Sequence, residues 1–249
     1  MTPNNDKAAA RSQKAAALRA EQERQEHRRR LLMIGGVAAV LVLLVGGLIA
    51  FSVMQQDKKE KHLEAAASTR SDYGVVIGPD SAAHKLVVYE DFLCPFCGEL
   101  EKQTHAELAQ LADAGKVQVE YRPFNLLGAD ADSYSVRSAN AFAVVLDSSG
   151  ADVAKKLHDL LYAHQPPESD PDSVTDDDLV DLAVQAGAKD DQVRSGIQGM
   201  DQVSWVEGAT REAQQAGVNS TPTLVLDGEK FEDGRTIDEL ADNLLGAVQ

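Results

Sequence analysis

The two cysteines of the chain, Cys94 and Cys97, lie three positions apart, where a strand is expected to run into a helix. The preceding segment, KLVVYEDF at 85–92, has the continuous apolar run that is typical of a buried strand. A helical pattern follows over 97–115 and ends at Gly115. Two thiols at such a junction can hold a metal, lock a loop or exchange electrons with another molecule.

Metal binding and a structural disulfide are the weaker interpretations. A structural zinc site needs about four Cys or His ligands, and the chain has two Cys and no His pair at ligand spacing. His105 is expected to pack in the core, on one helix face with Leu100, Leu108 and Leu111. A disulfide that closes so short a loop would constrain little of the unfolded chain. A redox role is therefore favoured, with no metal and no cofactor.

The position of the pair gives the physical basis for a redox role. A thiolate, not a thiol, attacks a disulfide, and an ordinary cysteine is only about 3% ionised at pH 7. At the start of a helix, Cys94 faces unpaired N–H groups and the positive end of the helix dipole, so its pKa should fall. Cys97, one turn inward, is expected to be buried, protonated and placed to resolve a mixed disulfide. Pro95 suits the first helical turn, where its missing N–H is not needed.

The rest of the chain predicts a helical block followed by a hairpin and a final helix. Short strands are expected at 74–78 and 116–124. Helices are expected at 133–147, 151–164, 175–187 and 202–217. The third of these opens with a capping box from Thr175 to Asp178, and the last helix of the chain opens with one from Thr236 to Glu239. Between them, VNSTPTLVLDGEKF predicts two strands joined by a turn at Asp227–Gly228.

An apolar segment near the N-terminus predicts a membrane anchor. Residues 31–54 are 24 uncharged, mostly apolar residues, long enough as a helix to cross a hydrocarbon layer about 30 Å thick. The run is longer than that of a cleaved signal peptide, which is usually about 7–15 residues. The five nearest arginines before the segment are Arg19, Arg24, Arg28, Arg29 and Arg30, and three lysines follow it closely. This difference favours a cytoplasmic N-terminus.

Charge is distributed unevenly along the chain. Residues 1–30 hold eight Lys and Arg against four Asp and Glu, whereas residues 55–249 hold 16 against 36. An acidic body of this kind repels nucleic acid and anionic lipid, so neither is an expected partner of the folded part.

The segments VVYEDFLCPFC and GVNSTPTLVLDG, with the helical block between them, together resemble the DsbA-like branch of the thioredoxin superfamily. The resemblance covers roughly residues 73–249. It implies an α/β thioredoxin fold with an inserted α-helical domain, here preceded by one transmembrane helix. It also implies that Thr221–Pro222 is a cis peptide bond in a loop against the cysteines, where the Thr221 backbone pairs with an extended substrate. The domains expected are a cytoplasmic basic tail at 1–30, the anchor at 31–54, a tether at 55–72, a thioredoxin-like domain at 73–131 and 211–249, and the inserted helical domain at 132–210.

Two features depart from the family pattern. Many thioredoxin relatives carry a buried acid six residues before the first cysteine, and that position is Val88 here. Glu90 and Asp91 are candidate proton relays, although a solvated or helix-capping acid is the more ordinary interpretation of each. The second departure is Phe96, which replaces the histidine of the best-known DsbA oxidases and removes one cation that stabilises a thiolate.

Other aromatic and histidine residues are weaker candidates. Phe92 and Phe96 flank the cysteines and are candidates for an apolar docking surface, although Phe92 also suits the end of a buried strand. Trp205 is expected in the core or between domains, and His158 and His164 are expected in packing or surface roles.

The sequence therefore predicts an extracytoplasmic, membrane-anchored thiol–disulfide oxidoreductase. Its expected substrates are reduced or misoxidised secreted proteins, and the resemblance suggests a quinone-linked membrane protein as the partner that reoxidises it. A reductase or isomerase of the same fold remains an alternative, as does a non-catalytic, chaperone-like peptide-binding module.

Overall fold

The computed structural model of the chain describes residues 60–249 without a gap. Before them it describes Glu21, Arg24, Arg28, Arg29, Met33, residues 43–48, 51, 52, 54, 55 and Lys58. The chain divides into two compact units, Met1–Asp57 and Lys58–Gln249. The second unit, Lys58–Gln249, contains both cysteines and the strands of the sheet.

A five-stranded mixed sheet, in the order β1-β3-β2-β4-β5, forms the centre of this unit. Its strands are β1 (Val75–Ile77), β2 (His84–Glu90), β3 (Val117–Pro123), β4 (Thr223–Leu226) and β5 (Glu229–Phe231). β2 and β3 run parallel, whereas β1 pairs antiparallel with β3, β4 with β2, and β5 with β4. β2 is the middle strand, so the residues that follow its end at Glu90 emerge at the centre of one edge of the sheet.

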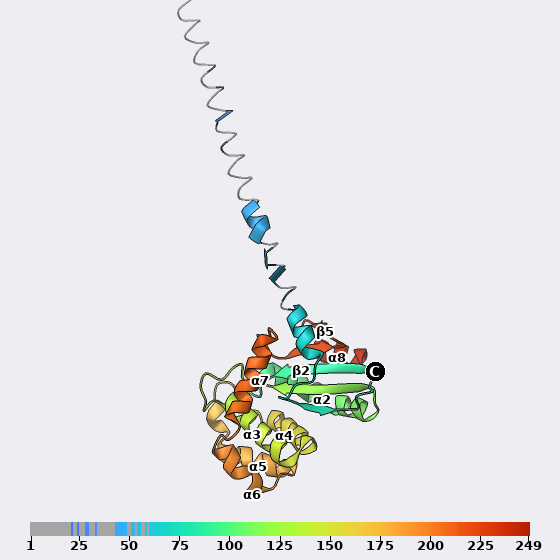
Figure 1. Cartoon of the computed structure of the whole chain (residues 1–249), viewed down its shortest axis with the longest axis vertical. Coiled ribbons are helices and arrows are strands. Elements are labelled where there is room, and N and C mark those ends of the chain that lie inside the picture. The colour runs from blue at the N-terminus through green and yellow to red at the C-terminus, as the bar shows by residue number, and fades with distance from the viewer. Residues whose placement is uncertain are drawn as a thin grey trace, which may run out of the picture. The chain divides into compact units, whose positions relative to one another are not determined.

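Helices cover both faces of the sheet (Figure 1). On one face, α2 (Pro95–Asp113) and α8 (Ile237–Ala247) pack over a core that includes Leu86, Val88 and Tyr121. On the other face, α7 (Val203–Gln215) covers Val87 and Tyr89. Alternate residues of β2 therefore enter opposite halves of the core, as the period of a strand requires.

A block of helices lies beside the sheet, inserted between β3 and β4 (Figure 1). It consists of α3 (Tyr134–Ser149), α4 (Ala151–Ala163), the short 3-10 helix η1 (Pro171–Ser173), α5 (Asp176–Ala186) and α6 (Asp190–Gln198). The thioredoxin fold and its helical content are thus present as predicted. Helix α6 was missed, because it has only nine residues and only Val193 and Ile197 give it a buried apolar side.

The predicted helix caps and the predicted hairpin turn lie where the sequence placed them. Thr175 accepts a hydrogen bond from the Asp178 main-chain N–H, and the Asp178 carboxylate accepts one from the Thr175 N–H, which completes the capping box. Asp227 and Gly228 both have positive φ, at 53° and 85°, as a tight hairpin turn requires. At Thr236 the box is altered, because the Glu239 carboxylate accepts from the Arg235 N–H.

The N-terminal edge of this unit is anchored to the sheet. Residues 61–67 are helical, and Leu63 is buried against α7 and the sheet. The guanidinium of Arg122, only 3% exposed, donates to the carbonyl oxygens of Ala66 at 3.1 Å and Thr69 at 2.5 Å. It also contacts Glu120 at 2.9 Å. Part of the segment assigned to a tether therefore packs on the domain.

The predicted membrane span at 31–54 falls mostly outside the described residues. Among the residues that are described, no helix is both long enough and apolar enough to cross a membrane.

We predict that Leu63→Ala lowers the free energy of unfolding of the domain by about 2 kcal/mol or more, because it removes a buried aliphatic side chain. Urea unfolding of residues 58–249 measures this effect. Leu127→Ala is the matched control, since Leu127 is 41% exposed and should change the free energy by much less. Equal effects of the two substitutions would show that the 61–67 helix does not pack on the domain in solution.

Candidate active site

Cys94 and Cys97 lie where β2 ends and α2 begins, as the spacing predicted. Cys94 is the N-cap of α2, and Pro95 occupies its first turn. The Cys94 carbonyl accepts from the N–H groups of Cys97 and Gly98, both at 3.1 Å. Both cysteines are free thiols, 4% and 2% exposed, whereas Phe96 between them is 61% exposed. The site therefore presents an apolar ring to solvent beside two shielded sulfurs.

The loop that carries Pro222 lies against Cys94. The Thr221–Pro222 peptide bond is cis, as the resemblance implied. The Cys94 thiol donates to the Thr221 carbonyl oxygen at 3.4 Å. This contact joins two segments that are 127 residues apart in the sequence.

The two thiols have opposite pKa shifts. A hydrogen bond from the Cys97 side chain is the main cause that lowers the pKa of Cys94 to about 6. Burial opposes this change, and hydrogen bonds from the Thr221 side chain and from the Cys97 and Phe96 main-chain N–H groups assist it. Burial is the main cause that raises the pKa of Cys97 well above its ordinary value. The predicted directions are confirmed, but the leading contribution at Cys94 comes from its neighbouring thiol, and the helix N-terminus is secondary.

Asp91 is buried, and its carboxylate connects the cysteine loop to neighbouring segments by hydrogen bonds. The expectation that Asp91 is a solvated or helix-capping acid is therefore wrong. One carboxylate oxygen accepts from the Leu93 N–H at 2.8 Å and from the Ser135 hydroxyl at 2.7 Å. The other accepts from the N–H groups of Leu126 and Leu127 at 2.7 and 2.9 Å. Each oxygen thus has two donors, and these join the cysteine loop to the loop after β3 and to α3.

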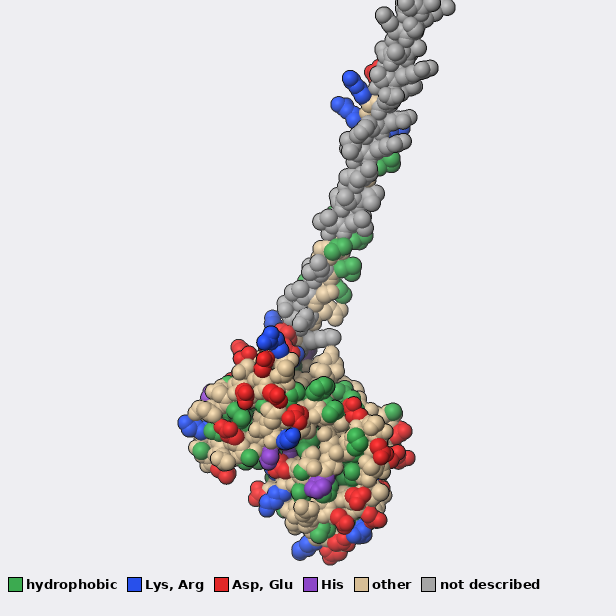
Figure 2. All heavy atoms as spheres, turned by 180° about the vertical axis from the view of Figure 1, so that it is seen from behind, with side chains coloured by type: hydrophobic (Ala, Val, Ile, Leu, Met, Phe, Trp, Pro, Cys, Tyr) green, Lys and Arg blue, Asp and Glu red, His purple; other side chains and the backbone are tan. Residues whose placement is uncertain are grey.

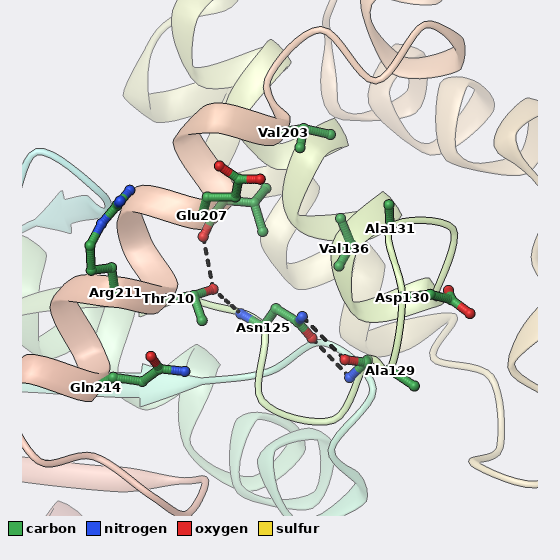
Figure 3. Close-up of a pocket in the computed structure, with 12 residues that line it drawn as sticks. Asn125, Ala129, Asp130, Ala131, Val136, Val203, Glu207, Thr210, Arg211 and Gln214 are labelled. Carbon is green, nitrogen blue, oxygen red and sulfur yellow. Dashed lines mark hydrogen bonds between the residues drawn. The ribbon is translucent and has the colours of Figure 1, made fainter.

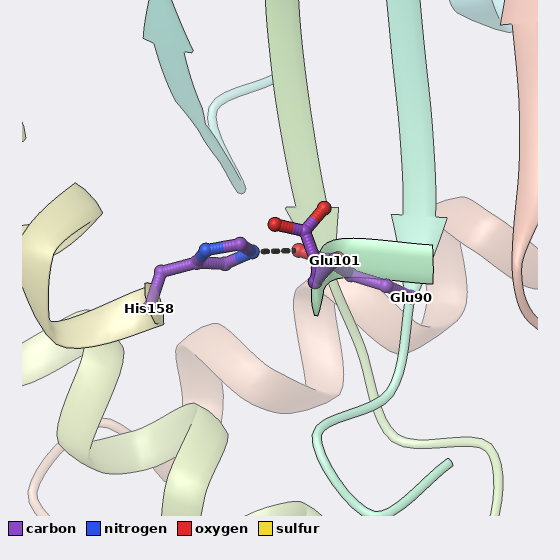
Figure 4. Close-up of side chains that lie close together, drawn as sticks. All are labelled: Glu90, Glu101 and His158. Atoms are coloured by element: carbon purple, nitrogen blue, oxygen red, sulfur yellow. Dashed lines mark hydrogen bonds and ion pairs between the residues drawn. The ribbon is translucent and has the colours of Figure 1, made fainter. Parts of the chain in front are cut away.

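The same expectation is wrong for Glu90, which is 1% exposed and pairs with a histidine (Figure 4). One of its carboxylate oxygens, Oε1, lies 2.7 Å from Nε2 of His158 on α4. The other, Oε2, has no hydrogen-bond partner among the described residues. Glu101 approaches the pair from α2 and is 4% exposed, and its Oε2 likewise lacks a partner there.

The donor atoms of Glu90, Glu101 and His158 all lie within 4.8 Å of one another. Three donors are fewer than the four of a structural zinc site. One donor pair is already joined by the Glu90–His158 hydrogen bond, so we interpret the group as an ion-paired cluster.

The pKa values of Glu101 and His158 are both raised, for different reasons. Burial is the main cause that raises the pKa of Glu101 to about 7, against the lowering effect of the His158 charge. Burial lowers the pKa of His158, but the charge of Glu90 and hydrogen bonds to Asp159 and Glu90 outweigh it, and the value is about 9. At neutral pH, His158 is therefore a cation.

The helical block holds the cysteine loop through two further sets of contacts. Gln165, after α4, donates to the carbonyl oxygens of Phe92 at 2.8 Å and Cys94 at 2.9 Å. Phe92 is 1% exposed, and its ring contacts the rings of Phe142, His158 and Tyr162. Phe92 therefore anchors the site to the helical block, and its predicted place in a docking surface is wrong.

Sequence patterns misplaced or missed several of these residues. His105 is exposed, because five residues turn a helix by about 500°, which puts it some 140° from Leu100. Glu101 lies four residues after Cys97, a spacing that puts both on the buried face of α2, and the sequence analysis overlooked it. His158 follows Leu157 on a helix face with Ala154 and Leu161, all fully buried, a spacing that signals its burial. Trp205 contacts Tyr73 and Phe142, as a packing residue should, and His164 is exposed.

Two cavities lie near this end of the sheet. One, of about 350 Å³, opens between α2 and α4 and is lined in part by Pro95, Glu101, Asp159 and Gln165. The other, of about 510 Å³, lies between α7 and the loop after β3 (Figure 3). In that loop, the Asn125 N–H donates to Thr210 at 3.1 Å. Neither cysteine lines either cavity, but the first is lined by Pro95, which follows Cys94, and by Gln165, which donates to the Cys94 carbonyl oxygen.

A mixed sheet with a Cys-Pro-Phe-Cys pair at the start of a helix and a cis-proline loop against the first sulfur defines a thioredoxin-type protein. A model of the thioredoxin family matches residues 70–244. Because this is well over half of the chain, the chain belongs to the thioredoxin family.

Within the family, the similarity is to DsbA-like thiol–disulfide oxidoreductases, which confirms the resemblance. The chain is 28% identical over 184 residues to the probable disulfide bond formation protein D of Bacillus cereus, covering 72% of this chain and 80% of that protein. The reduced disulfide bond oxidoreductase DsbG of Mycobacterium tuberculosis has a TM-score of 0.61 and 25% identity, covering 75% of this chain and 98% of that one. MdbA, a thiol-disulfide oxidoreductase from Corynebacterium matruchotii, supports the fold, with a TM-score of 0.59, 24% identity and coverage of 78% and 100%.

We predict that alkylation of the reduced protein by iodoacetamide modifies Cys94 with a midpoint near pH 6 and leaves Cys97 unmodified over the same range. Cys97→Ala should move the midpoint upward, because it removes the main hydrogen bond to the Cys94 thiolate. Cys97→Ser, which keeps a donor, should move it less. Mass spectrometry of the peptides measures both effects. An unchanged midpoint in Cys97→Ala would assign the low pKa to Thr221 and the helix N-terminus instead.

Proposed function

We propose that the protein is a thiol–disulfide oxidoreductase that oxidises unfolded secreted proteins through Cys94 and Cys97 on the outer side of a cell membrane. The observation that carries the proposal is the position of Cys94 at the N-cap of α2, beside the buried Cys97 and against the Thr221 carbonyl oxygen. This arrangement lowers the pKa of Cys94 to about 6 and raises that of Cys97. The Cys94 sulfur is then a good leaving group and nucleophile at neutral pH, while the Cys97 sulfur stays protonated until it resolves a mixed disulfide.

The two sulfurs have different roles in the exchange. In the oxidised enzyme they form a disulfide, and a substrate thiolate attacks the Cys94 sulfur. The S–S bond breaks, its electron pair goes to the Cys97 sulfur, and Cys97 takes up a proton. A second substrate thiolate then attacks the substrate sulfur of the mixed disulfide and releases Cys94 as a thiolate. The enzyme gains two electrons, and the substrate gains one disulfide.

Substrate binding is assigned to the surface around Phe96 and Pro222. Phe96 is an exposed apolar side chain beside the sulfurs, which suits an unfolded chain with apolar residues. Thr221 lies against Cys94 and offers its backbone to an extended peptide. Pro95 fixes the helix start that holds this arrangement.

The location rests on the sequence. The basic segment 1–30 and the apolar segment 31–54 support a single span with a cytoplasmic N-terminus. Disulfides persist in oxidising compartments, which suits a catalytic domain on the outer side. A quinone-linked membrane protein is the proposed acceptor of the two electrons. Acidic side chains are spread over the face that Figure 2 shows, which disfavours nucleic acid as a partner.

The pKa of Cys94 also supports an expectation for the reduction potential. Values near 7 and 3.5 accompany potentials of about −270 mV in thioredoxin and about −120 mV in DsbA. Each pKa unit of thiolate stabilisation corresponds to about 30 mV, so a Cys94 pKa of about 6 is expected to give a potential between these two values. The protein would then be a milder oxidant than DsbA, as the replacement of the histidine between the cysteines by Phe96 suggested. Whether it oxidises or reduces its substrates then depends on the partner that reoxidises it.

We predict that the oxidised domain introduces disulfides into a reduced, unfolded protein, with Cys94→Ser inactive and Cys97→Ser accumulating covalent complexes with the substrate. Reduced ribonuclease A is a suitable substrate, because its regained activity reports disulfide formation. Equilibration with glutathione measures the potential.

Other outcomes identify the alternatives. A potential near −270 mV, with reduction favoured over oxidation, would identify a reductase. Rescue of scrambled ribonuclease without net oxidation would identify an isomerase. Failure of both oxidised and reduced forms to exchange would leave a non-catalytic peptide-binding module.

A further inference from the structure

The side chain of Gln165 connects the helical block to the loop that carries Cys94. Its carboxamide nitrogen donates to the Phe92 carbonyl oxygen at 2.8 Å and to the Cys94 carbonyl oxygen at 2.9 Å. A carboxamide NH2 group has two hydrogens, so each of these carbonyls takes one. The two carbonyls lie on either side of Leu93, and Gln165 therefore holds the turn between the end of β2 and the start of α2.

The backbone of Gln165 is itself held in place. Gln165 follows His164, the C-cap of α4, and its own N–H donates to the Tyr162 carbonyl oxygen at 3.3 Å. Pro166 and Pro167 come next, and a proline restricts the residue before it to extended conformations. The carboxamide therefore reaches the cysteine loop from a stiff segment of backbone.

Gly98, four residues after Cys94, provides the space for this carboxamide. A β-carbon on Gly98 would lie 2.4 Å from Oε1 and 3.2 Å from Cδ of Gln165, and the first distance is shorter than unbonded atoms tolerate. The backbone of Gly98 is helical and has no positive φ, so an alanine could adopt its conformation. Glycine is also less favourable than alanine inside a helix. The space that Gln165 needs explains this glycine, whereas the conformation of the backbone does not.

The contact fixes the backbone of Cys94. The Cys94 carbonyl accepts from the N–H groups of Cys97 and Gly98, both at 3.1 Å, and from Gln165. The first two bonds form the start of α2, and the third connects that start to the helical block. Cys94 has an extended backbone, with φ −69° and ψ 116°, and its sulfur lies 3.4 Å from the Thr221 carbonyl oxygen. Rotation of this backbone would move the sulfur relative to both Thr221 and Cys97.

We propose that Gln165 is a positioning residue that holds the Cys94 sulfur in place for thiol–disulfide exchange. We propose also that Gly98 lacks a side chain because one would push the Gln165 carboxamide off the Cys94 carbonyl. This role rests on the proposed function and adds a link from the helical block to the reactive sulfur. The hydrogen bonds of Gln165 end on main-chain oxygens, so its effect on the reaction passes through the backbone of Cys94.

Loss of this contact should destabilise the Cys94 thiolate. The hydrogen bond from Cys97 is the main cause that lowers the pKa of Cys94 to about 6, and a shifted Cys94 backbone would weaken it. Cys97 itself stays protonated in this range, because burial raises its pKa well above the ordinary value. The thiolate exists only in the reduced protein. Its destabilisation therefore favours the reaction in which reduced protein and one glutathione disulfide give the protein disulfide and two glutathione molecules.

The first test is Gln165→Ala, which removes the carboxamide and leaves its space empty. We expect the pH midpoint of Cys94 alkylation by iodoacetamide to rise by about one pH unit. At pH 7 the thiolate fraction then falls from about 90% to about 50%. The equilibrium with glutathione should move about five-fold toward the protein disulfide.

Gly98→Ala tests the fit between the two residues. The new methyl group meets the far end of a flexible side chain, so the protein can fold with the Gln165 carboxamide displaced. We expect the alkylation midpoint to rise as it does in Gln165→Ala. In the double variant the space is already vacant, so Gly98→Ala should add no further shift.

Matched controls lie on α2 and α8. Gln103→Ala removes a carboxamide that donates to Glu99 at 2.9 Å and to Asp238 at 2.7 Å, and not to the cysteine loop. Gly246→Ala on α8 places a methyl group where no atom lies within 4 Å. Both controls should leave the alkylation midpoint and the glutathione equilibrium unchanged. Urea unfolding of each variant verifies that it is folded.

An alkylation midpoint that stays near pH 6 in Gln165→Ala would overturn the positioning role. Additive shifts in the double variant, or no shift in Gly98→Ala, would overturn the explanation of the glycine. Equal shifts in Gln103→Ala and Gln165→Ala would indicate a general loosening of α2 and would also overturn the proposal. Alkylation needs no disulfide exchange, so a wild-type protein that fails to oxidise ribonuclease A would refute the proposed function instead.

Discussion

The hydrogen bond from the Cys97 thiol to the Cys94 sulfur is the interaction on which the site depends. It stabilises the Cys94 thiolate while Cys97 stays protonated, and it needs the two sulfurs to be held within hydrogen-bonding distance. The structure meets this need with main-chain contacts. The Cys94 N–H donates to the Asp91 carbonyl at 2.9 Å, and Gln165 donates to the Cys94 carbonyl from the opposite side. A loop that moved freely would lose the geometry, and with it the low pKa of Cys94.

The helical block inserted between β3 and β4 is part of this support. It supplies the Ser135 hydroxyl to Asp91, the Gln165 amide to the cysteine loop, and the aromatic rings that enclose Phe92. These contacts explain why a fold that already has a central sheet carries so large an insertion beside its reactive end. The block also forms one wall of the 350 Å³ cavity between α2 and α4, because α4 contributes Asp159 and Tyr162 to its lining.

Local patterns in the sequence predicted the elements that depend on local chemistry. The strand of 85–92, the helix start at Cys94 and Pro95, the Thr175 capping box and the Asp227–Gly228 turn each depend on a few neighbouring residues. What the sequence did not show depends on tertiary contacts. Glu90 and Asp91 are charged residues next to a turn, where solvent exposure is the ordinary expectation, and only donors from α3, α4 and the loop after β3 make their burial tolerable. His105 was misplaced for a simpler reason, an error of helical phase.

The charges of the site also tie its stability to pH, with opposite signs. Cys94 has a folded pKa near 6, below its ordinary value of 9, so the stability it gives the reduced domain is present above pH 9 and is lost as the pH falls through 6. His158 has a folded pKa near 9, above its ordinary value of 6.5, so its contribution is present below pH 6.5 and is lost as the pH rises through 9. The two changes partly cancel in the reduced protein.

Of these two contributions to stability, only that of His158 persists in the disulfide form, because that form has no thiol to titrate. At pH 7 the Cys94 thiolate therefore stabilises the reduced form, relative to the disulfide form, by about one pKa unit. This is on the order of 1.4 kcal/mol, or 30 mV in the reduction potential. A modest oxidant follows from this balance.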